Sequence, residues 1–342
     1  MKLKQIIYLL LVSVILLSCA NEKKETKFNH FVEQFADIRV LRYKVPGFEE
    51  LSFKEKSLVY YLTQAGLSGR DIMWDQNYKH NLKIREALEN INTNFSGDRE
   101  SDDFKAFKVY LKRVWFSNGI HHHYSNDKIK PAFTRAYFET ELLKKSNTII
   151  AEEVIGVLFN DADAKKVNKK EGVDNILSSA INFYGSDITD KDVSDFYKTA
   201  YRGPKGMPVE AGLNSKLVRE NGVLVEKVWK SGGMYGAAID QIIAWLEKAQ
   251  GVAENENQAK ALGLLIEYYK TGSLDVWDQY CIAWVTSTEG NIDWINGFIE
   301  VYNDPKGYRG SYETIVEIKD FDMSRKMAVL SENAQWFEDN SP

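Results

Sequence analysis

The chain has 342 residues, of which 44% are hydrophobic and 27% charged, with only 6 prolines. This is the composition of a globular protein, and the length suits one large or two ordinary domains. The net charge is −5 and no run of basic residues occurs. These two features argue against nucleic acid as a partner.

The N-terminus has the pattern of an export signal. Lys2 and Lys4 precede an apolar run from Ile6 to Leu17, which is too short to span a bilayer and therefore predicts a signal peptide over residues 1–19. The run ends in Leu-Leu-Ser-Cys19, which resembles a bacterial lipobox. We expect Cys19 to be lipidated and the protein to be an exported bacterial lipoprotein, anchored to a membrane and facing the periplasm or the outer membrane. The alternative is an ordinary signal peptide that happens to contain a cysteine.

The first half of the folded region is predicted to be helical. Residues 20–27 are polar and predict a flexible tether, so that folded structure begins near Phe28 and runs to residue 342. Gly66 is expected to end the first helix, and Ser101 to cap the third. Apolar residues at helical spacing predict helices over 54–65, 79–91, 101–115, 135–145, 149–158 and 172–183.

The second half mixes helices and strands. After a loop over 203–208, residues 215–229 predict a β-hairpin that turns at Asn221-Gly222, because both residues tolerate positive φ. The fold class predicted from these patterns is α+β, predominantly helical, with a small antiparallel or barrel-like sheet late in the chain. We predict helices over 235–250, over 256–270, from Ser273 and over 328–337, and strands over 281–286 and 312–319. Cys281, in the apolar run 280–285, is expected to be a buried small hydrophobe and not a disulfide partner.

The histidines do not form a recognisable zinc motif. None of them is followed by Glu in a His-Glu-x-x-His or His-Glu-x-x-x-His arrangement. His121, His122 and His123 are consecutive, and consecutive side chains diverge, so they rarely close on one metal ion. Asn118-Gly119 predicts a turn that displays them. We expect Asn118, His121 and His123 to line a cleft, where one imidazole bonds to substrate or to a neighbouring domain; a metal site at this loop is the alternative.

The segment 297–313 carries a dense group of charged residues whose chemistry suggests a binding site. It places Glu300, Tyr302, Asp304, Arg309 and Glu313 around a Pro-x-Gly turn. Such a cluster can bind a charged peptide end. On an ordinary strand Glu300 and Tyr302 would point to the same face. The alternative is that Asp304, Arg309 and Glu313 only brace a surface turn.

This segment resembles the substrate-binding signature of the dipeptidyl peptidase III family of zinc metallopeptidases, Gly-Phe-Ile-Glu-x-Tyr-x-Asp-Pro-x-Gly-x-Arg-Gly. Further segments are similar to the bacterial branch of that family. The resemblance covers roughly residues 30 to 340. Within the signature, Asn303 is a departure, because other members of the family carry arginine at this position. The further matching segments are 37–43, 45–48, 69–77, 118–124 and 212–217.

By matched position, the resemblance assigns three roles. It implies that Glu300 receives the free amino group of the peptide and that Glu313 is a second carboxylate of the same subsite. It implies that Tyr302 hydrogen-bonds the peptide near the scissile carbonyl, where it can stabilise the transition state. A protonated α-amine has three donors, which two carboxylates satisfy with charge-assisted bonds. Such an anchor would fix cleavage two residues into the peptide.

The resemblance also implies what a complete enzyme contains. Zinc is the family's cofactor, held by a His-Glu-x-x-Gly-His motif and a downstream Glu-Glu-x-x-x-Asp motif, and neither occurs in this sequence. We therefore expect the N-terminal, substrate-recognising lobe of a truncated zinc-dependent dipeptidyl peptidase that releases N-terminal dipeptides from oligopeptides. The catalytic lobe is its missing partner, and the chain alone is expected to be inactive. The alternative is a non-catalytic, surface-tethered lipoprotein that binds peptides.

Overall fold

The computed structural model describes residues 28–160, 165–199 and 211–341. The predicted signal peptide with Cys19, the predicted tether 20–27 and the predicted loop 203–208 therefore lie outside the described residues. The chain divides into two compact units, residues 1–44 and residues 45–342. The described part of the first unit is an antiparallel pair of strands, β1 (Phe31–Phe35) and β2 (Ile38–Leu41), which the sequence patterns did not predict.

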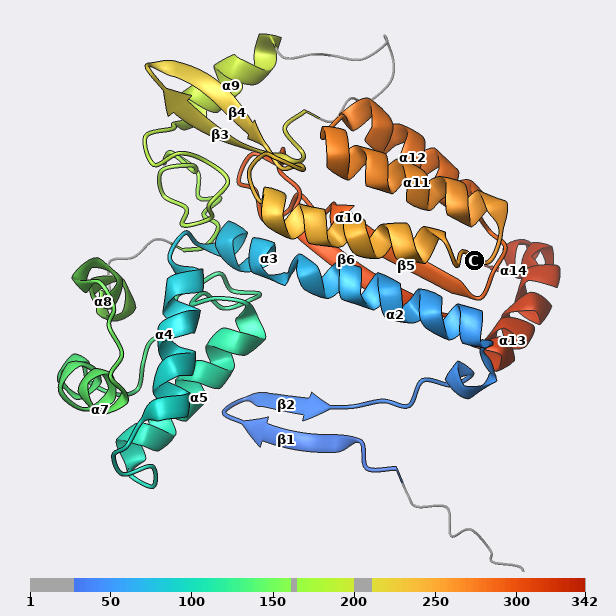
Figure 1. Ribbon diagram of the computed structural model, residues 1–342. Coiled ribbons are helices and arrows are strands. Elements are labelled where there is room, and N and C mark those ends of the chain that lie inside the picture. The colour runs from blue at the N-terminus through green and yellow to red at the C-terminus, as the bar shows by residue number, and fades with distance from the viewer. Residues whose placement is uncertain (1–27, 161–164, 200–210, 342) are drawn as a thin grey trace, which may run out of the picture. The chain divides into compact units, whose positions relative to one another are not determined.

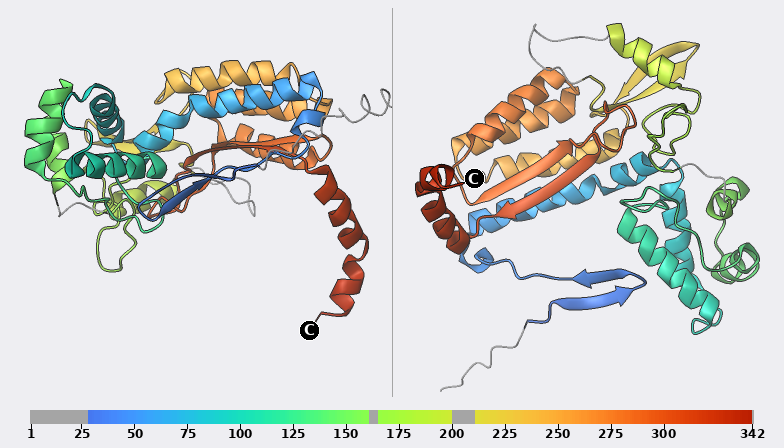
Figure 2. Two further views of the ribbon diagram at one scale, coloured as in Figure 1. Left: turned by 90° about the horizontal axis from the view of Figure 1, so that it is seen from below. Right: turned by 180° about the vertical axis from the view of Figure 1, so that it is seen from behind.

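The larger core of the second unit is a row of helices packed on a two-stranded sheet. Helix α2 packs against α10, α10 against α11, and α11 against α12. The view from below in Figure 2 shows α2 and α10 lying over one face of the sheet β5–β6. The elements of this core are α2 (Phe53–Ser68), α10 (Gly236–Gln250), α11 (Glu256–Thr271), α12 (Leu274–Thr286), β5 (Ile292–Phe298) and β6 (Tyr312–Ile318).

The antiparallel register of β5 and β6 sets the position of the signature segment. Phe298 pairs with Tyr312, and Gly297 pairs with Glu313. Tyr312 and the β5 residues Ile292, Trp294 and Phe298 are buried, so one face of the sheet is sealed against the helices. The strand predicted over 312–319 is confirmed, whereas β5 was not predicted.

The strand predicted over 281–286 is wrong, because these residues belong to α12. Ser273 caps that helix by accepting the N–H of Val276, and Tyr280 and Ala283 are buried at helical spacing. Ile282 and Val285 are both 63% exposed, so this apolar run is not a strand that is buried on both faces. Cys281 on the same helix is half-buried rather than buried.

A second core is built from the green and cyan helices of Figure 1. It confirms the helices predicted over 79–91, 101–115, 135–145 and 149–158, and Ser101 caps α5 as predicted. Helix α3 (Arg70–Asn77) joins the two cores: its Trp74 is buried in this core and its Ile72 in the larger one. The other elements are η1 (Phe48–Glu50), α4 (Asn81–Asn94), α5 (Asp102–Ser117), α6 (Arg135–Tyr137), η2 (Phe138–Leu143), α7 (Lys144–Ser146) and α8 (Glu152–Phe159).

Helix α2 runs past the predicted stop at Gly66 and ends at Ser68. Gly66 lies inside the helix, at the point where β6 packs closely against α2. A Cβ at this position would lie 2.5 Å from Thr314 Oγ1. The glycine therefore permits a helix–strand contact and does not end the helix.

The middle of the chain departs most from the sequence prediction. The helix predicted over 172–183 is wrong, because these residues form turns, and α9 (Asp190–Thr199) follows them without having been predicted. The hairpin of β3 (Ser215–Glu220) and β4 (Val223–Val228) is confirmed, with Asn221 at φ 51° and Gly222 at φ 83°. The helices predicted over 235–250 and 256–270 are confirmed as α10 and α11.

The chain ends in two helices, α13 (Phe321–Glu332) and α14 (Ala334–Asp339), which confirm the helix predicted over 328–337. The predicted α+β class is confirmed: helices predominate, and the described strands form antiparallel two-stranded sheets. In the described residues, no helix has both the length and the hydropathy to span a bilayer.

Candidate functional site

The β5–β6 pairing continues into the signature segment. Ile299 donates its N–H to Ser311 O, and Ser311 donates its N–H to Glu300 O, both at 3.0 Å. Glu300 is thus the last paired residue, and Tyr302 lies in the turn beyond it. The strand geometry considered for these two residues does not apply, because β5 ends at Phe298.

The structure nevertheless brings Glu300, Tyr302 and Glu313 together. Burial and then the charge of Glu300 raise the pKa of Glu313. Burial, followed by the charges of Glu313 and Glu300, raises the pKa of Tyr302. Tyr302 is 64% exposed, so this group of two carboxylates and a phenol faces solvent. Two neighbouring carboxylates repel each other, and a bound cation relieves that repulsion.

Asp304 and Arg309 brace the turn, as the sequence alternative held, but both are 0% exposed and so brace it from the inside and not at the surface. Asp304 Oδ2 accepts the backbone N–H groups of Tyr308 and Arg309, each at 2.9 Å. Tyr184 donates its hydroxyl to Asp304, at 2.8 Å from Oδ2. These bonds close the turn from the inside and hold the chain that follows Tyr302.

Arg309 is enclosed by two tyrosines that the sequence analysis missed. Its Nη1 donates to Tyr184 Oη at 3.0 Å and its Nη2 to Tyr197 Oη at 2.6 Å. Its guanidinium carbon lies 4.3 Å from the ring centroid of Tyr184 and 5.1 Å from that of Tyr197. Tyr197 in turn donates to Glu226 on β4. Hydrogen bonds, ring faces and the Asp304 carboxylate together compensate the buried cation.

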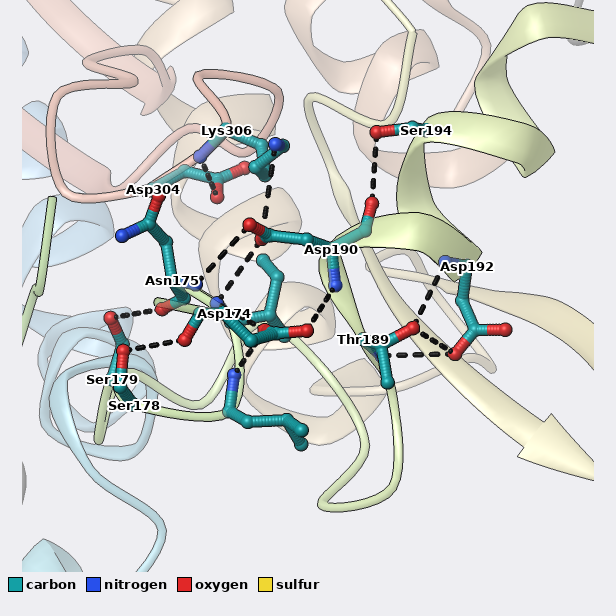
Figure 3. Close-up of polar contacts among 12 residues, drawn as sticks. Asp174, Asn175, Ser178, Ser179, Thr189, Asp190, Asp192, Ser194, Asp304 and Lys306 are labelled. Atoms are coloured by element: carbon teal, nitrogen blue, oxygen red, sulfur yellow. Dashed lines mark hydrogen bonds and ion pairs between the residues drawn. The ribbon is translucent and has the colours of Figure 1, made fainter. Parts of the chain in front are cut away.

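A second link joins the turn to Asp190, the first residue of α9, and through it to the loop before that helix (Figure 3). Lys306 Nζ lies 3.8 Å from Asp190 Oδ1. Asp190 also accepts the backbone N–H of Asn175 at 3.2 Å, and its own N–H donates to Asp174 Oδ2 at 2.9 Å. The carboxylates thereby bind backbone N–H groups in this loop, which explains why it turns where the sequence predicted a helix.

Gln76 and Asn77, at the end of α3, hold two segments next to each other. These segments are the start of β6 and the loop that contains His121, His122 and His123. Gln76 accepts the N–H of Tyr312 at 2.8 Å and donates to Gly310 O at 3.2 Å. Asn77 donates to Asn118 O at 3.1 Å. Tyr124, in the loop that follows Asn118, is among the groups that raise the pKa of Tyr302. This loop therefore lies near the signature segment.

The predicted turn at Asn118-Gly119 is present, with Asn118 at φ 50° and Gly119 at φ 147°. His121 is 3% exposed and its ring lies edge-on against Tyr78, 5.4 Å away, while the ring of His123 contacts that of Phe116 at 4.8 Å. The contribution of Asn118, His121 and His123 to substrate binding stays a prediction. Within residues 28–160, 165–199 and 211–341, no three His, Cys, Asp or Glu side chains are grouped so that they could hold a metal ion.

Comparison with known proteins agrees with the signature. The family model described as "Peptidase family M49" matches residues 210–342 of this chain. "Dipeptidyl peptidase 3" of Rattus norvegicus is 31% identical over 103 residues, and that of Dictyostelium discoideum is 31% identical over 110 residues. Over residues 210–342 the chain is similar to the dipeptidyl peptidase III family, and the family match is limited to this part.

The sequence match covers a small part of these relatives. It spans 30% of this chain and 14% of the rat protein, and 32% of this chain and 16% of the Dictyostelium protein. The fold similarity is wider. The dipeptidyl peptidase III structure from Caldithrix abyssi has a TM-score of 0.57 at 19% identity, covering 87% of this chain and 45% of that one. The structure from Corallococcus sp. strain EGB has a TM-score of 0.57 at 16% identity, covering 87% and 44%.

The described residues do not fit the zinc ion that the similarity to dipeptidyl peptidase III implies. His122 Nδ1 accepts the N–H groups of Tyr124 and Ser125, both at 3.2 Å, so this ring nitrogen is bonded to its own loop. The rings of His121 and His123 pack against different neighbours. The histidine loop therefore does not offer the convergent donors of a zinc site.

Proposed function

We propose that this chain supplies the peptide-binding part of a dipeptidyl peptidase III-type enzyme, in which Glu300 and Glu313 bind the N-terminal amine of an oligopeptide. Two observations carry the proposal: the β5–β6 pairing sets Glu313 opposite Gly297 and joins Glu300 to Ser311, and the pKa of Glu313 is raised by burial and by the charge of Glu300. A protonated amine between the two groups adds charge-assisted bonds and cancels their repulsion. A neutral, acetylated N-terminus does neither.

Tyr302 is the proposed hydrogen-bond donor to the bound peptide. A tyrosine hydroxyl with its ordinary pKa of about 10 is protonated at neutral pH, and burial and the charges of Glu313 and Glu300 raise the pKa of Tyr302 further. A phenol that stays protonated donates to a carbonyl oxygen, which is the group a peptide presents next to its amine. The distance from the amine anchor then selects the bond two residues along as the one presented for cleavage.

We propose that hydrolysis needs donors beyond those that the described residues offer. In an enzyme of this family zinc supplies an activated water. This chain contributes binding and orientation of the substrate, and no zinc centre is assembled from its described residues. We therefore propose that the chain by itself does not hydrolyse peptides and acts together with a catalytic lobe. A peptide-binding lipoprotein without any catalytic partner is the second candidate.

We further propose that the protein is exported and held at a membrane by a lipid on Cys19. The support is the sequence alone: a short apolar run preceded by Lys2 and Lys4 and ended by Leu-Leu-Ser-Cys19. A single acyl chain gives marginal binding, so stable retention requires more than one.

The proposed amine site is tested by calorimetry on the full chain. The probe is a short peptide of small residues, used with a free amine and with an acetylated one. The free amine should bind about ten- to a hundredfold more tightly, since one charge-assisted bond contributes about 1.5–3 kcal/mol. Equal affinities would refute the amine site. Release of dipeptides by the purified chain with added zinc would refute only the claim of inactivity.

A further inference from the structure

A hollow lies between the end of α3, the loop 176–186 and β3, and none of the three residues of the amine site lines it. Its volume is about 310 Å³. Isoleucine and leucine residues form part of its wall, with Leu177 the most exposed of them at 53%, and two lysines and an asparagine form another part. Among the described residues, no Asp or Glu lines it. The lining residues used below are Lys79, Ile176, Leu177, Ile181, Asn182 and Lys216.

Lys216 is a half-buried cation held by a chain of hydrogen bonds. Its Nζ donates to Asn182 Oδ1. Asn182 Nδ2 donates to Asp75 Oδ2 at 3.0 Å, and Tyr235 Oη donates to the same oxygen at 2.6 Å. Asp75 therefore fixes the amide of Asn182 with its oxygen toward Lys216. Among the described residues, Asn182 is the hydrogen-bond partner of this ammonium, which has three donors.

The charge of Lys216 is not balanced by a direct carboxylate contact. Burial is the largest cause that lowers the pKa of Lys216, and the charge of Lys79 lowers it further, while Asp75 acts in the opposite direction. Two ammonium groups of like charge thus face one hollow. An anion that enters it would bond to donors that are already in place and would relieve their repulsion.

Hydrogen bonds within residues 174–179 fix the backbone of the loop that forms the apolar wall (Figure 3). Asp174 Oδ1 accepts the N–H groups of Ile176 and Leu177, at 3.0 and 2.9 Å. Ser179 Oγ donates to Asn175 O at 2.7 Å. Because these bonds already fix the backbone of the wall, binding a ligand does not carry the entropic cost of ordering this loop.

We infer that this hollow is a binding site for a carboxylate with an apolar body. The carboxylate bonds to Lys216 and faces Lys79, and the apolar part contacts Ile176, Leu177 and Ile181. A carboxylate of this kind occurs at the C-terminus of a peptide and in a free acid. The inference does not depend on the amine site at Glu300, since neither the residues nor the ligand group are shared.

The test uses N-acetyl-leucine and N-acetyl-leucinamide as probes, measured by calorimetry on the full chain. Both lack a free amine, so the result is independent of the amine site. The acid should bind at least about tenfold more tightly than the amide, because only the acid forms a charge-assisted bond. N-acetyl-Ala-Ala-Leu, with a free carboxylate, identifies the source: tighter binding than N-acetyl-leucine indicates a peptide C-terminus, and weaker binding indicates a free acid.

The variants Lys216→Met and Lys79→Met remove one ammonium each and keep the aliphatic stem. Lys216→Met should weaken binding of the acid about ten- to a hundredfold, and the exposed Lys79→Met about two- to fivefold. Lys54→Met, an exposed lysine on α2, is the matched control and should have no effect. Should Lys216→Met fail to fold, Lys79→Met and the comparison of acid with amide still decide. Equal binding of acid and amide, or loss of affinity with Lys54→Met as large as with Lys79→Met, would overturn the inference.

Discussion

Tyr184 Oη lies 2.9 Å from Asp304 Oδ1 and 2.8 Å from Oδ2, joining two residues that are 120 positions apart. The same hydroxyl accepts from Arg309. One phenol therefore connects the loop before α9 to both ends of the turn that follows Tyr302. This contact ties the shape of the candidate amine site to a segment that the signature does not include.

The first prediction concerns this phenol. Tyr184→Phe removes the hydroxyl and leaves Asp304 and Arg309 buried with one partner fewer. We expect the free energy of unfolding to fall by about 1–3 kcal/mol, the cost of an unsatisfied buried polar group. Denaturant unfolding measures this. Tyr124→Phe is the control, since Tyr124 is 85% exposed and should change stability by less than about 0.5 kcal/mol. Equal stability of the two variants would contradict the network.

Arg309 gives a stronger version of the same test. Arg309→Met fills the volume but leaves Asp304 buried without a cation, and breaking a buried pair costs about 3–5 kcal/mol. The control Arg135→Met removes an exposed cation that pairs with Glu139, and its effect on stability should be much smaller than that of Arg309→Met. Urea unfolding at neutral pH compares them. A loss below about 1 kcal/mol for Arg309→Met would show that the pair is not needed.

Two helical glycines separate close packing from helix propensity. Gly66→Ala should destabilise the protein by about 1–3 kcal/mol, since its Cβ would lie 2.5 Å from Thr314 Oγ1. Gly156→Ala in α8 meets nothing within 4 Å and should stabilise by about 0.5–1 kcal/mol, the propensity difference. Thermal unfolding of both variants gives the sign. If Gly66→Ala also stabilised, the close approach of α2 to β6 would be wrong.

Glu313 predicts a pH dependence. A carboxyl whose pKa in the folded state is raised above its usual 4.5 favours folding below that value, and this contribution is lost as the pH rises through the raised pKa. Glu313→Gln should therefore be slightly more stable than the wild type at neutral pH, and the difference should disappear near pH 4. The effect should stay below about 1 kcal/mol, because the group is largely solvated. The exposed Glu317→Gln on the same strand is the control, and a Glu313→Gln variant less stable at neutral pH would contradict the prediction.

Membrane attachment is tested by Cys19→Ser. We expect the wild type to partition into the detergent phase and the variant into the aqueous phase, since the lipid would be lost with the cysteine. Cys281→Ser, which leaves the lipobox intact, should partition as the wild type does. Equal partition of the wild type and Cys19→Ser would refute the lipid anchor.

Local patterns predicted much of the fold. The helix 101–115 was found because its apolar residues repeat at helical spacing and Ser101 caps it. The hairpin at Asn221-Gly222 was found because its turn requires positive φ. The strand predicted over 281–286 failed because exposed Ile282 and Val285 hide the periodicity of α12.

The candidate site was predicted only in part. The grouping of Glu300, Tyr302 and Glu313 followed from the family resemblance; in the structure the two carboxylates act on the pKa of Tyr302, and the roles of the three residues stay predictions. The burial of Asp304 and Arg309 depends on Tyr184 and Tyr197, which lie more than a hundred positions away. No spacing in the sequence marks such a contact, because it is set by how the loop before α9 packs against the turn.

The central claim is that Glu300 binds a charged amine, and a cycle of two changes tests it most directly. Glu300→Gln keeps the shape and removes the charge, and acetylation removes the charge of the peptide. Calorimetry should show Glu300→Gln weakening the free-amine peptide about ten- to a hundredfold while leaving the acetylated peptide unchanged, with Glu317→Gln affecting neither. An equal loss for both peptides, or no loss for the free amine, would contradict the account.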